Sequence, residues 1–277
     1  MQRTLLILTI TALALATGCA TDKTARKMGA DPNLQYVETE TGRWLIHDME
    51  RPTPPVITPP TPSTQDQPGQ KPGDAIWLFD GTSATMSNWT DTKGNPSKWV
   101  VRDGYMESVK GAGYIRTADE FGSCHLHVEF ATPTPAKGSG QGRGNSGVFL
   151  PGEYEIQVLD SYENRTYADG QCGALYGRAV PEVNACRPPG QWQTYDIIYI
   201  RPIFKGETDE VIRKPWFNVW HNGVPIHYHV ELDGGTGWQG PHRISDFKYH
   251  PDTGPIMLQD HGNPVRYRNI WIRPIED

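Results

Sequence analysis

The sequence predicts an all-β fold, a two-sheet sandwich of jelly-roll type, and three observations support this class. From Asp74 onward, short runs rich in Val, Ile, Tyr, Phe and Trp alternate with turns that contain Gly or Pro. No stretch keeps a helical period of apolar residues. The 277 residues include nine Trp and twelve Tyr, which suits a β core with many aromatic side chains. A closed barrel has the same pattern and is the structural alternative.

The expected strands follow one another at short intervals. Asp103-Gly104 and Asn222-Gly223 are turn dipeptides inside apolar segments, so both segments are predicted to be hairpins. In chain order the strands are expected within residues 75–79, 99–109, 114–117, 124–132, 148–150, 154–158, 192–204, 216–232, 256–259 and 265–274.

The segment 144–162 is predicted to form the floor of a binding site. Within it Tyr154, Ile156 and Val158 alternate with Glu155 and Gln157, so the apolar residues face a core and the polar pair shares the open face. Asp160 joins that face only if a bulge interrupts the strand. Upstream, Arg143 and Asn145 lie among glycines, which allow a close approach of backbone and ligand.

The N-terminus is expected to be a processing signal. An apolar run at residues 5–16 is too short to span a bilayer, and the sequence Leu-Ala-Thr-Gly-Cys at residues 15–19 resembles a bacterial lipobox. This predicts a lipoprotein signal peptide at residues 1–18 and lipidation of Cys19; an ordinary secretory signal is the alternative. The protein is therefore expected in the bacterial cell envelope, lipid-anchored to the outer membrane and facing the periplasm or the surface.

A Pro/Thr-rich linker is expected at residues 19–73, because the segment RPTPPVITPPTPSTQDQPGQKPG can bury little apolar surface. It would be a disordered, solvated tether, with a short strand or hairpin within residues 36–48 that packs against the domain. The globular domain is then residues 74–277. The net charge of -6 gives no basic surface that would suggest a nucleic acid as partner.

Cysteine usage agrees with export. Cys172 and Cys186 fall in loops, and in an oxidising compartment they are predicted to form a disulfide. Cys124 alternates with apolar residues and is expected to be a buried free thiol. A zinc site is the alternative, although no Cys-x-x-Cys spacing supports it.

Several ordered motifs carry a family resemblance across residues 74–277. They are WLFDGTS, NSGVFL, YEIQVLDSYEN, YADGQCGALYG, WQTYDIIY, HNGVPIHYHVEL and GPIMLQDHGNPVRYRNIWIRPI. Together they resemble the 3-keto-disaccharide hydrolase domain family, formerly a domain of unknown function. The resemblance implies a concanavalin A-like sandwich that binds its ligand on the concave sheet. It also implies a hydrolase that acts in sugar metabolism in the periplasm or at the cell surface.

The acidic residues do not fit an ordinary retaining glycosidase. Laminarinase-like members of this fold carry Glu-x-Asp-x-x-Glu on one strand, whereas this chain has Glu155-x-Gln157-x-x-Asp160. Gln157 cannot ionise, so the usual pair of carboxyl groups is incomplete.

An elimination route needs different groups. A ketone at C3 of a sugar acidifies the C2 proton, so a base can remove that proton before the glycosidic oxygen leaves C1 and water adds back. Glu155 is the expected base, Asp160 or His261 the acid, and Arg143 with His229 the stabilisers of the enolate oxygen. The sequence leaves open whether a divalent metal ion assists. It contains no dinucleotide fingerprint, so a separate sugar 3-dehydrogenase is expected to supply the 3-keto-disaccharide.

Further polar and aromatic residues are expected to bind the sugar. Trp238, in the loop GGTGWQG, is the expected stacking platform, and Tyr176 is a second candidate. The polar candidates are Asn145, Gln157, Gln259, Asp260 and Arg266. A non-catalytic carbohydrate-binding module would use the same face and is the alternative function.

Overall fold

The computed structural model describes residues 36–39, 42–45, 49, 51, 60–240, 242–243 and 245–276. The chain divides into two units, Met1–Pro55 and Val56–Asp277. The predicted signal peptide at residues 1–18 and the predicted lipidation site Cys19 lie outside the described residues. In the first unit, β1 (Tyr36–Thr39) and β2 (Gly42–Leu45) form an antiparallel hairpin. None of the helices described is long and apolar enough to cross a membrane.

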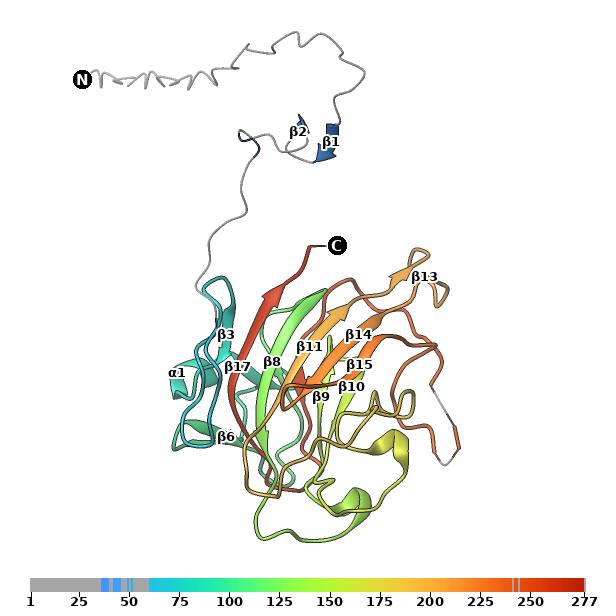
Figure 1. Cartoon of the computed structure of the whole chain (residues 1–277). Coiled ribbons are helices and arrows are strands. Elements are labelled where there is room, and N and C mark those ends of the chain that lie inside the picture. The colour runs from blue at the N-terminus through green and yellow to red at the C-terminus, as the bar shows by residue number, and fades with distance from the viewer. Residues whose placement is uncertain are drawn as a thin grey trace, which may run out of the picture. The chain divides into compact units, whose positions relative to one another are not determined.

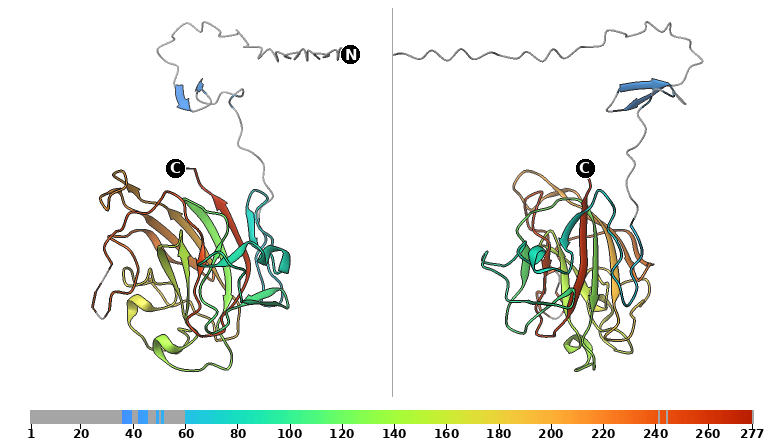
Figure 2. Two further views of the ribbon diagram at one scale, coloured as in Figure 1. Left: turned by 180° about the vertical axis from the view of Figure 1, so that it is seen from behind. Right: turned by 90° about the vertical axis from the view of Figure 1, so that its left-hand side faces the viewer.

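The second unit is built mainly from two antiparallel sheets, with β12 (Ile203–Phe204) and β13 (Val211–Arg213) paired as a separate two-stranded sheet (Figures 1 and 2). The smaller has the order β10 (Tyr154–Val158), β9 (Ser146–Leu150), β16 (Met257–Leu258), β7 (Ile115–Thr117) and β4 (Trp89–Asp91). The larger has the order β15 (Val224–Glu231), β14 (Trp216–His221), β11 (Gln193–Ile200), β8 (Cys124–Ala131), β17 (Arg266–Pro274), β6 (Tyr105–Glu107) and β5 (Val100–Arg102), with β3 (Ile76–Phe79) also paired to β17. The remaining elements are one helical turn α1 (Ser83–Met86) and the 3-10 turns η1 (Gly140–Gly142) and η2 (Ala168–Gly170).

Alternation of side chains along each strand builds the core between the sheets. On β8, Leu126, Val128 and Phe130 are fully buried in it, and on β10 Ile156 and Val158 meet them from the other sheet. The all-β two-sheet sandwich predicted from the sequence is therefore confirmed. Cys124 is a buried free thiol, as predicted.

The last part of the expected linker is not a solvated spacer. Residues 60–73 pack against the outer face of the large sheet. Gln65 exchanges two hydrogen bonds with the backbone of Trp192, donating from Nε2 to its carbonyl (2.9 Å) and accepting from its amide (2.7 Å). Arg268 donates to the carbonyl of Thr64 (2.6 Å). The packed unit thus begins before Asp74. Composition did not indicate this, because the residues that hold the segment are more than 100 positions away along the chain.

A buried charge network lies beneath this docked segment. His127 Nδ1 is 2.8 Å from Asp196, and its Nε2 is 3.6 Å from Glu129. Glu129 in turn accepts from Arg268 Nε (2.7 Å) and from Ser63. Burial alone would lower the pKa of His127, but its hydrogen bond to Asp196 and its charge interaction with Glu129 outweigh this effect and raise the pKa to about 9.

This network predicts a pH-dependent stability. Because the pKa of His127 is raised by folding, its contribution is fully present below pH 6.5 and is lost as the pH rises through about 9. The shift from 6.5 to about 9 corresponds to roughly 3 kcal/mol in the free energy of unfolding. Urea denaturation at pH 7 and pH 10 should therefore show a larger loss in wild type than in His127→Gln. His125→Gln is the matched control, since His125 is 3.5 Å from Asp196 and more exposed; an equal loss in wild type and His127→Gln would contradict the assignment.

Candidate active site

A cleft of about 400 Å³ lies on the face of the small sheet that points away from the core. The structure places Glu155 and Gln157 on this face, as the alternation in β10 predicts. Across the β9–β10 pairing, Glu155 is opposite Phe149 and Gln157 is opposite Gly147. The cleft is lined by Tyr114, Gln141, Asn145, Phe149, Glu155, Gln157, Tyr167, Tyr176, Gly237, Trp238, Gln259 and His261.

Glu155 is the only carboxylate among these lining residues. Its residue is 7% exposed, and burial raises the pKa of its carboxyl to about 8. Gly147 in β9 leaves room for this carboxyl group, since a Cβ at that position would come too close to Glu155 Oε1 and the carboxyl group would have to move. A carboxyl group with this pKa is mostly protonated at pH 7, and its smaller deprotonated fraction can accept a proton and later return it.

Side-chain amides surround the carboxyl group. Gln157 Nε2 donates to Gln141 Oε1 (2.9 Å), and with its amide turned over the nitrogen would lie 3.2 Å from Glu155 Oε1. The amide of Gln157 can therefore donate a hydrogen bond either to Gln141 or to the carboxylate of Glu155. Asn145 Nδ2 donates to the carbonyl of Gln141 (2.7 Å), which fixes the position of both residues.

Tyr114 provides a hydroxyl to the same cleft. Gln259 Nε2 donates to its oxygen (2.6 Å), so the hydroxyl hydrogen stays available for a ligand. Burial raises the pKa of Tyr114, although the hydrogen bond from Gln259 opposes this, so the phenol is neutral. Within the cleft, Tyr114 is thus a neutral donor near a basic carboxylate.

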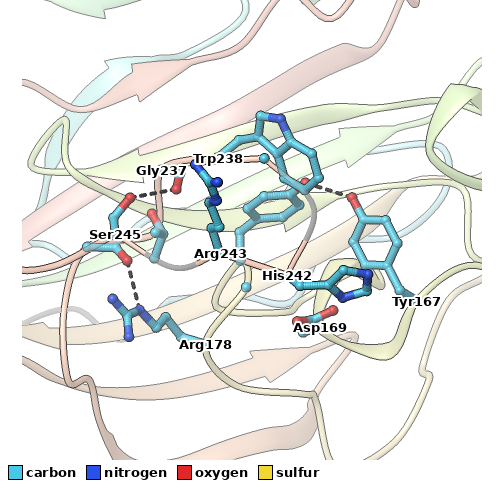
Figure 3. A pocket seen from close by; sticks show the side chains of 13 residues that line it. Tyr167, Asp169, Arg178, Gly237, Trp238, His242, Arg243 and Ser245 are labelled. Atoms are coloured by element: carbon cyan, nitrogen blue, oxygen red, sulfur yellow. Dashed lines mark hydrogen bonds between the residues drawn. The ribbon is translucent and has the colours of Figure 1, made fainter.

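Aromatic residues form one rim of the cleft and continue into an adjoining pocket of about 280 Å³ (Figure 3). The hydroxyls of Tyr167 and Tyr176 are 2.6 Å apart, and both residues line both cavities. Trp238 is 61% exposed at the shared edge. Tyr167, Asp169 and His242 lie toward one end of the adjoining pocket in Figure 3, and Arg178 and Ser245 toward the other. An exposed indole beside polar groups offers a surface on which a sugar ring can stack.

Asp160 and Arg143 are not in the cleft lining. Asp160 is 1% exposed, and Arg143 Nε donates to its Oδ2 at 2.7 Å. Arg143 also donates to the carbonyl of Tyr162 (2.9 Å). The pair therefore braces the loop that follows β10, and the expected roles of Asp160 as an acid and of Arg143 at an enolate oxygen are not supported by their positions.

Three further predicted site residues lie elsewhere. His229 is on β15 of the large sheet, where its ring packs on Trp216 at 4.6 Å between centroids. Arg266 on β17 donates to the carbonyl of Gly190 (3.0 Å). Asp260 accepts from the backbone amides of Gly113 (3.1 Å) and Gly262 (2.8 Å), so it caps the turn beside the cleft.

The predicted residues that the structure does bring together are Glu155, His261, Asn145, Gln157, Tyr176, Trp238 and Gln259. Those that sequence reasoning missed are Tyr114, Gln141, Phe149 and Tyr167. Phe149 could have been predicted from the sequence. It follows a core residue in an expected strand, so its side chain faces the cleft. Gln141 gave no signal, since a lone amide in a glycine-rich loop has no period.

The predicted disulfide is not formed in the structure. Cys172 and Cys186 are both free thiols, although their sulfur atoms lie within 4.8 Å of each other.

Comparison with known proteins identifies the family of the chain. Residues 74–273 match the model of the 3-keto-alpha-glucoside-1,2-lyase-like domain. A solved structure of a candidate glycosyl hydrolase from Parabacteroides distasonis ATCC 8503 is 41% identical, covers 83% of this chain and 95% of its own, and superposes with a TM-score of 0.76. A second candidate glycosyl hydrolase from the same organism is 20% identical, covers 73% of this chain and 94% of its own, and has a TM-score of 0.52, which shows a shared fold. No curated protein is significantly similar in sequence. The chain therefore belongs to the family of the 3-keto-alpha-glucoside-1,2-lyase-like domain.

Proposed function

We propose that this protein cleaves 3-keto-glycosides, including 3-keto-disaccharides, by abstraction of the C2 proton, elimination at C1 and addition of water. The family and the candidate glycosyl hydrolases support a carbohydrate-active role. The observation that carries the finer proposal is the single buried carboxyl group of Glu155 in a cleft otherwise lined by amides, hydroxyls, aromatic rings and one imidazole.

This set of groups suits elimination better than direct displacement. A displacement glycosidase uses two carboxyl groups on either side of the glycosidic bond, and the cleft lining has one. Elimination beside a ketone needs one base, donors for the enolate oxygen and an acid for the leaving oxygen. Glu155, Tyr114 and His261 provide these three kinds of group.

The proposed steps conserve atoms and electrons. Glu155 takes the proton from C2, and the pair of electrons moves to the C3 oxygen, where Tyr114 and the amide of Gln157 donate hydrogen bonds. The electrons then return to form the C1–C2 double bond while the C1–O bond breaks, and His261 gives a proton to the leaving oxygen. Water then adds to C1 and gives its proton to the deprotonated His261, and C2 takes back a proton from Glu155, so both residues regain their starting states and the net change is hydrolysis.

The direct test is product formation by the purified domain from a 3-keto-disaccharide and from the unmodified disaccharide, each with and without a chelator. Cleavage of the keto sugar alone supports elimination. Cleavage of both sugars would favour ordinary hydrolysis. Cleavage of neither, with sugar binding retained, would favour the carbohydrate-binding module.

The rim gives a separate prediction for binding. Trp238→Ala should raise KM for the keto sugar roughly tenfold and change kcat little, because a stacked ring contributes about 0.5–1.5 kcal/mol beyond its buried area. Steady-state kinetics measure this directly. Trp192→Ala, on the outer face of the large sheet, is the matched control. An unchanged KM in Trp238→Ala would show that the indole only covers its own loop.

The location and partners belong to the same proposal. The lipobox-like sequence before Cys19 supports a lipid anchor in the outer membrane. The 3-keto substrate implies a separate dehydrogenase that oxidises C3 of the sugar.

A further inference from the structure

We infer that Cys172, Cys186 and His221 form a binding site for a divalent transition metal ion such as Zn²⁺, separate from the cleft. Among the described residues they are the one group of three or more Cys, His, Asp or Glu side chains whose ligand atoms all lie within 4.8 Å of one another. Two thiolates and an imidazole are the donors that Zn²⁺ prefers. The two cysteines come from the loops after β10, and His221 ends β14.

The hydrogen bonds of His221 leave the correct nitrogen available. Its Nε2 lies 2.8 Å from Gln193 Oε1. The same oxygen accepts from the backbone amide of Arg187 (3.0 Å) and from Asn222 Nδ2 (3.3 Å), which identifies it as the carbonyl oxygen of the amide. Nε2 must therefore carry the hydrogen, and Nδ1 has the lone pair.

That lone pair has no partner within the described part of the protein. His221 is fully buried, and its Nδ1 is a buried atom without a hydrogen bond. An unpaired buried acceptor is destabilising because it has lost its hydrogen bonds to water, and a bond to a metal ion would remove that cost. Metal-ligating histidines commonly donate their other ring N–H to an oxygen, and Gln193 supplies that oxygen here.

Charge balance favours a divalent ion. Two thiolates and a neutral imidazole carry a charge of -2, so Zn²⁺ makes the buried set neutral, whereas a monovalent ion would leave a buried negative charge. The hydroxyl of Tyr195 donates to the carbonyl of Gln157 (2.7 Å), so its oxygen, 3.0 Å from Cys172 Sγ, accepts from the thiol of Cys172. Metal binding would release that thiol proton. Cys186 is the only one of the three ligand residues that is partly exposed.

The metal site would stabilise the backbone segment that pairs with the cleft strand β10. Beside Cys172, the amide of Gly173 donates to the carbonyl of Gln157 (2.8 Å), and the amide of Gln157 donates to the carbonyl of Ala174 (2.9 Å). The amide of Tyr176 donates to the carbonyl of Glu155 (3.1 Å). A metal bound to Cys172 and His221 would therefore tie the loop that carries Tyr176 to the large sheet, so its role is structural.

The test begins with the wild-type full chain, reduced and loaded with Zn²⁺ or Co²⁺. X-ray absorption of the zinc form should show two sulfur ligands at about 2.3 Å and a nitrogen at about 2.0–2.1 Å. The cobalt form should show sulfur-to-metal charge-transfer absorption, with one equivalent bound per chain. These readouts need no variant and no enzymatic activity. Ligation by oxygen alone would overturn the proposal.

Variants then identify the ligands. His221→Gln and Cys186→Ser should each weaken metal binding at least tenfold and abolish or reduce the charge-transfer band. Cys124→Ala is the matched control, because Cys124 is a buried free thiol outside the group, and it should bind like wild type. Equal weakening by Cys124→Ala would contradict the assignment. So would a Cys172–Cys186 disulfide, found by peptide mapping, in protein isolated unreduced from its native envelope.

Discussion

Glu155→Gln is expected to lower kcat for a 3-keto-disaccharide by a factor of roughly 10²–10⁴, while KM changes only a few fold. The substitution keeps the shape of the side chain and its place opposite Phe149, but the amide cannot take a proton from carbon. Steady-state kinetics with the keto sugar measure both constants. Glu153→Gln is the matched control, since it makes the same change two residues earlier on the chain.

The pH profile gives an independent check on the same residue. Burial raises the pKa of Glu155 to about 8, and the base must be deprotonated to act. If removal of the C2 proton limits the rate, the acid acts only in a later step, and kcat/KM should rise about tenfold per pH unit below 8 and level off above it. A profile that is flat from pH 5 to 8, or a Glu155→Gln variant that keeps wild-type kcat, would remove Glu155 as the base.

The local parts of the fold and site were predictable from sequence. Alternation in β10 depends only on neighbouring residues, so it placed Ile156 in the core and Glu155 on the open face. The turn dipeptide Asn222-Gly223 likewise marked the β14–β15 hairpin, because a tight turn needs the backbone that these residues allow.

The errors arose where a side chain has a choice of distant partners. Polar character and strand parity suggested His229 as a site residue, but parity cannot say which of the two sheets a strand joins, and β15 lies at the edge of the large sheet. Arg266, a predicted sugar-binding residue, lies outside the cleft for the same reason, because its strand β17 also belongs to the large sheet. Residues 60–73 looked like a spacer by composition, yet Gln65 and Thr64 bind Trp192 and Arg268, which only the folded chain brings near.

Arg143→Leu is expected to lower the free energy of unfolding by about 3–5 kcal/mol, because it leaves the carboxylate of Asp160 buried without its partner. Arg143 also holds the carbonyl of Tyr162, so the loop after β10 would loosen. Chemical denaturation measures the loss. Arg187→Leu is the control, since the side chain of Arg187 donates one hydrogen bond to the carbonyl of Trp192 (2.8 Å) and has no ion pair in the described structure.

The double variant Arg143→Leu/Asp160→Asn separates a structural role from a chemical one. The neutral amide that replaces the carboxylate can still accept from the backbone amide of Tyr162, as Asp160 Oδ1 does at 3.2 Å, while the unpaired charge is removed. If the pair is structural, the double variant should regain part of the lost stability and keep kcat within a few fold of wild type. If Asp160 is the acid that protonates the leaving oxygen, every variant that lacks its carboxyl group should lose kcat, including a well-folded Asp160→Asn. The buried ion pair and the absence of both residues from the cleft lining favour the first result.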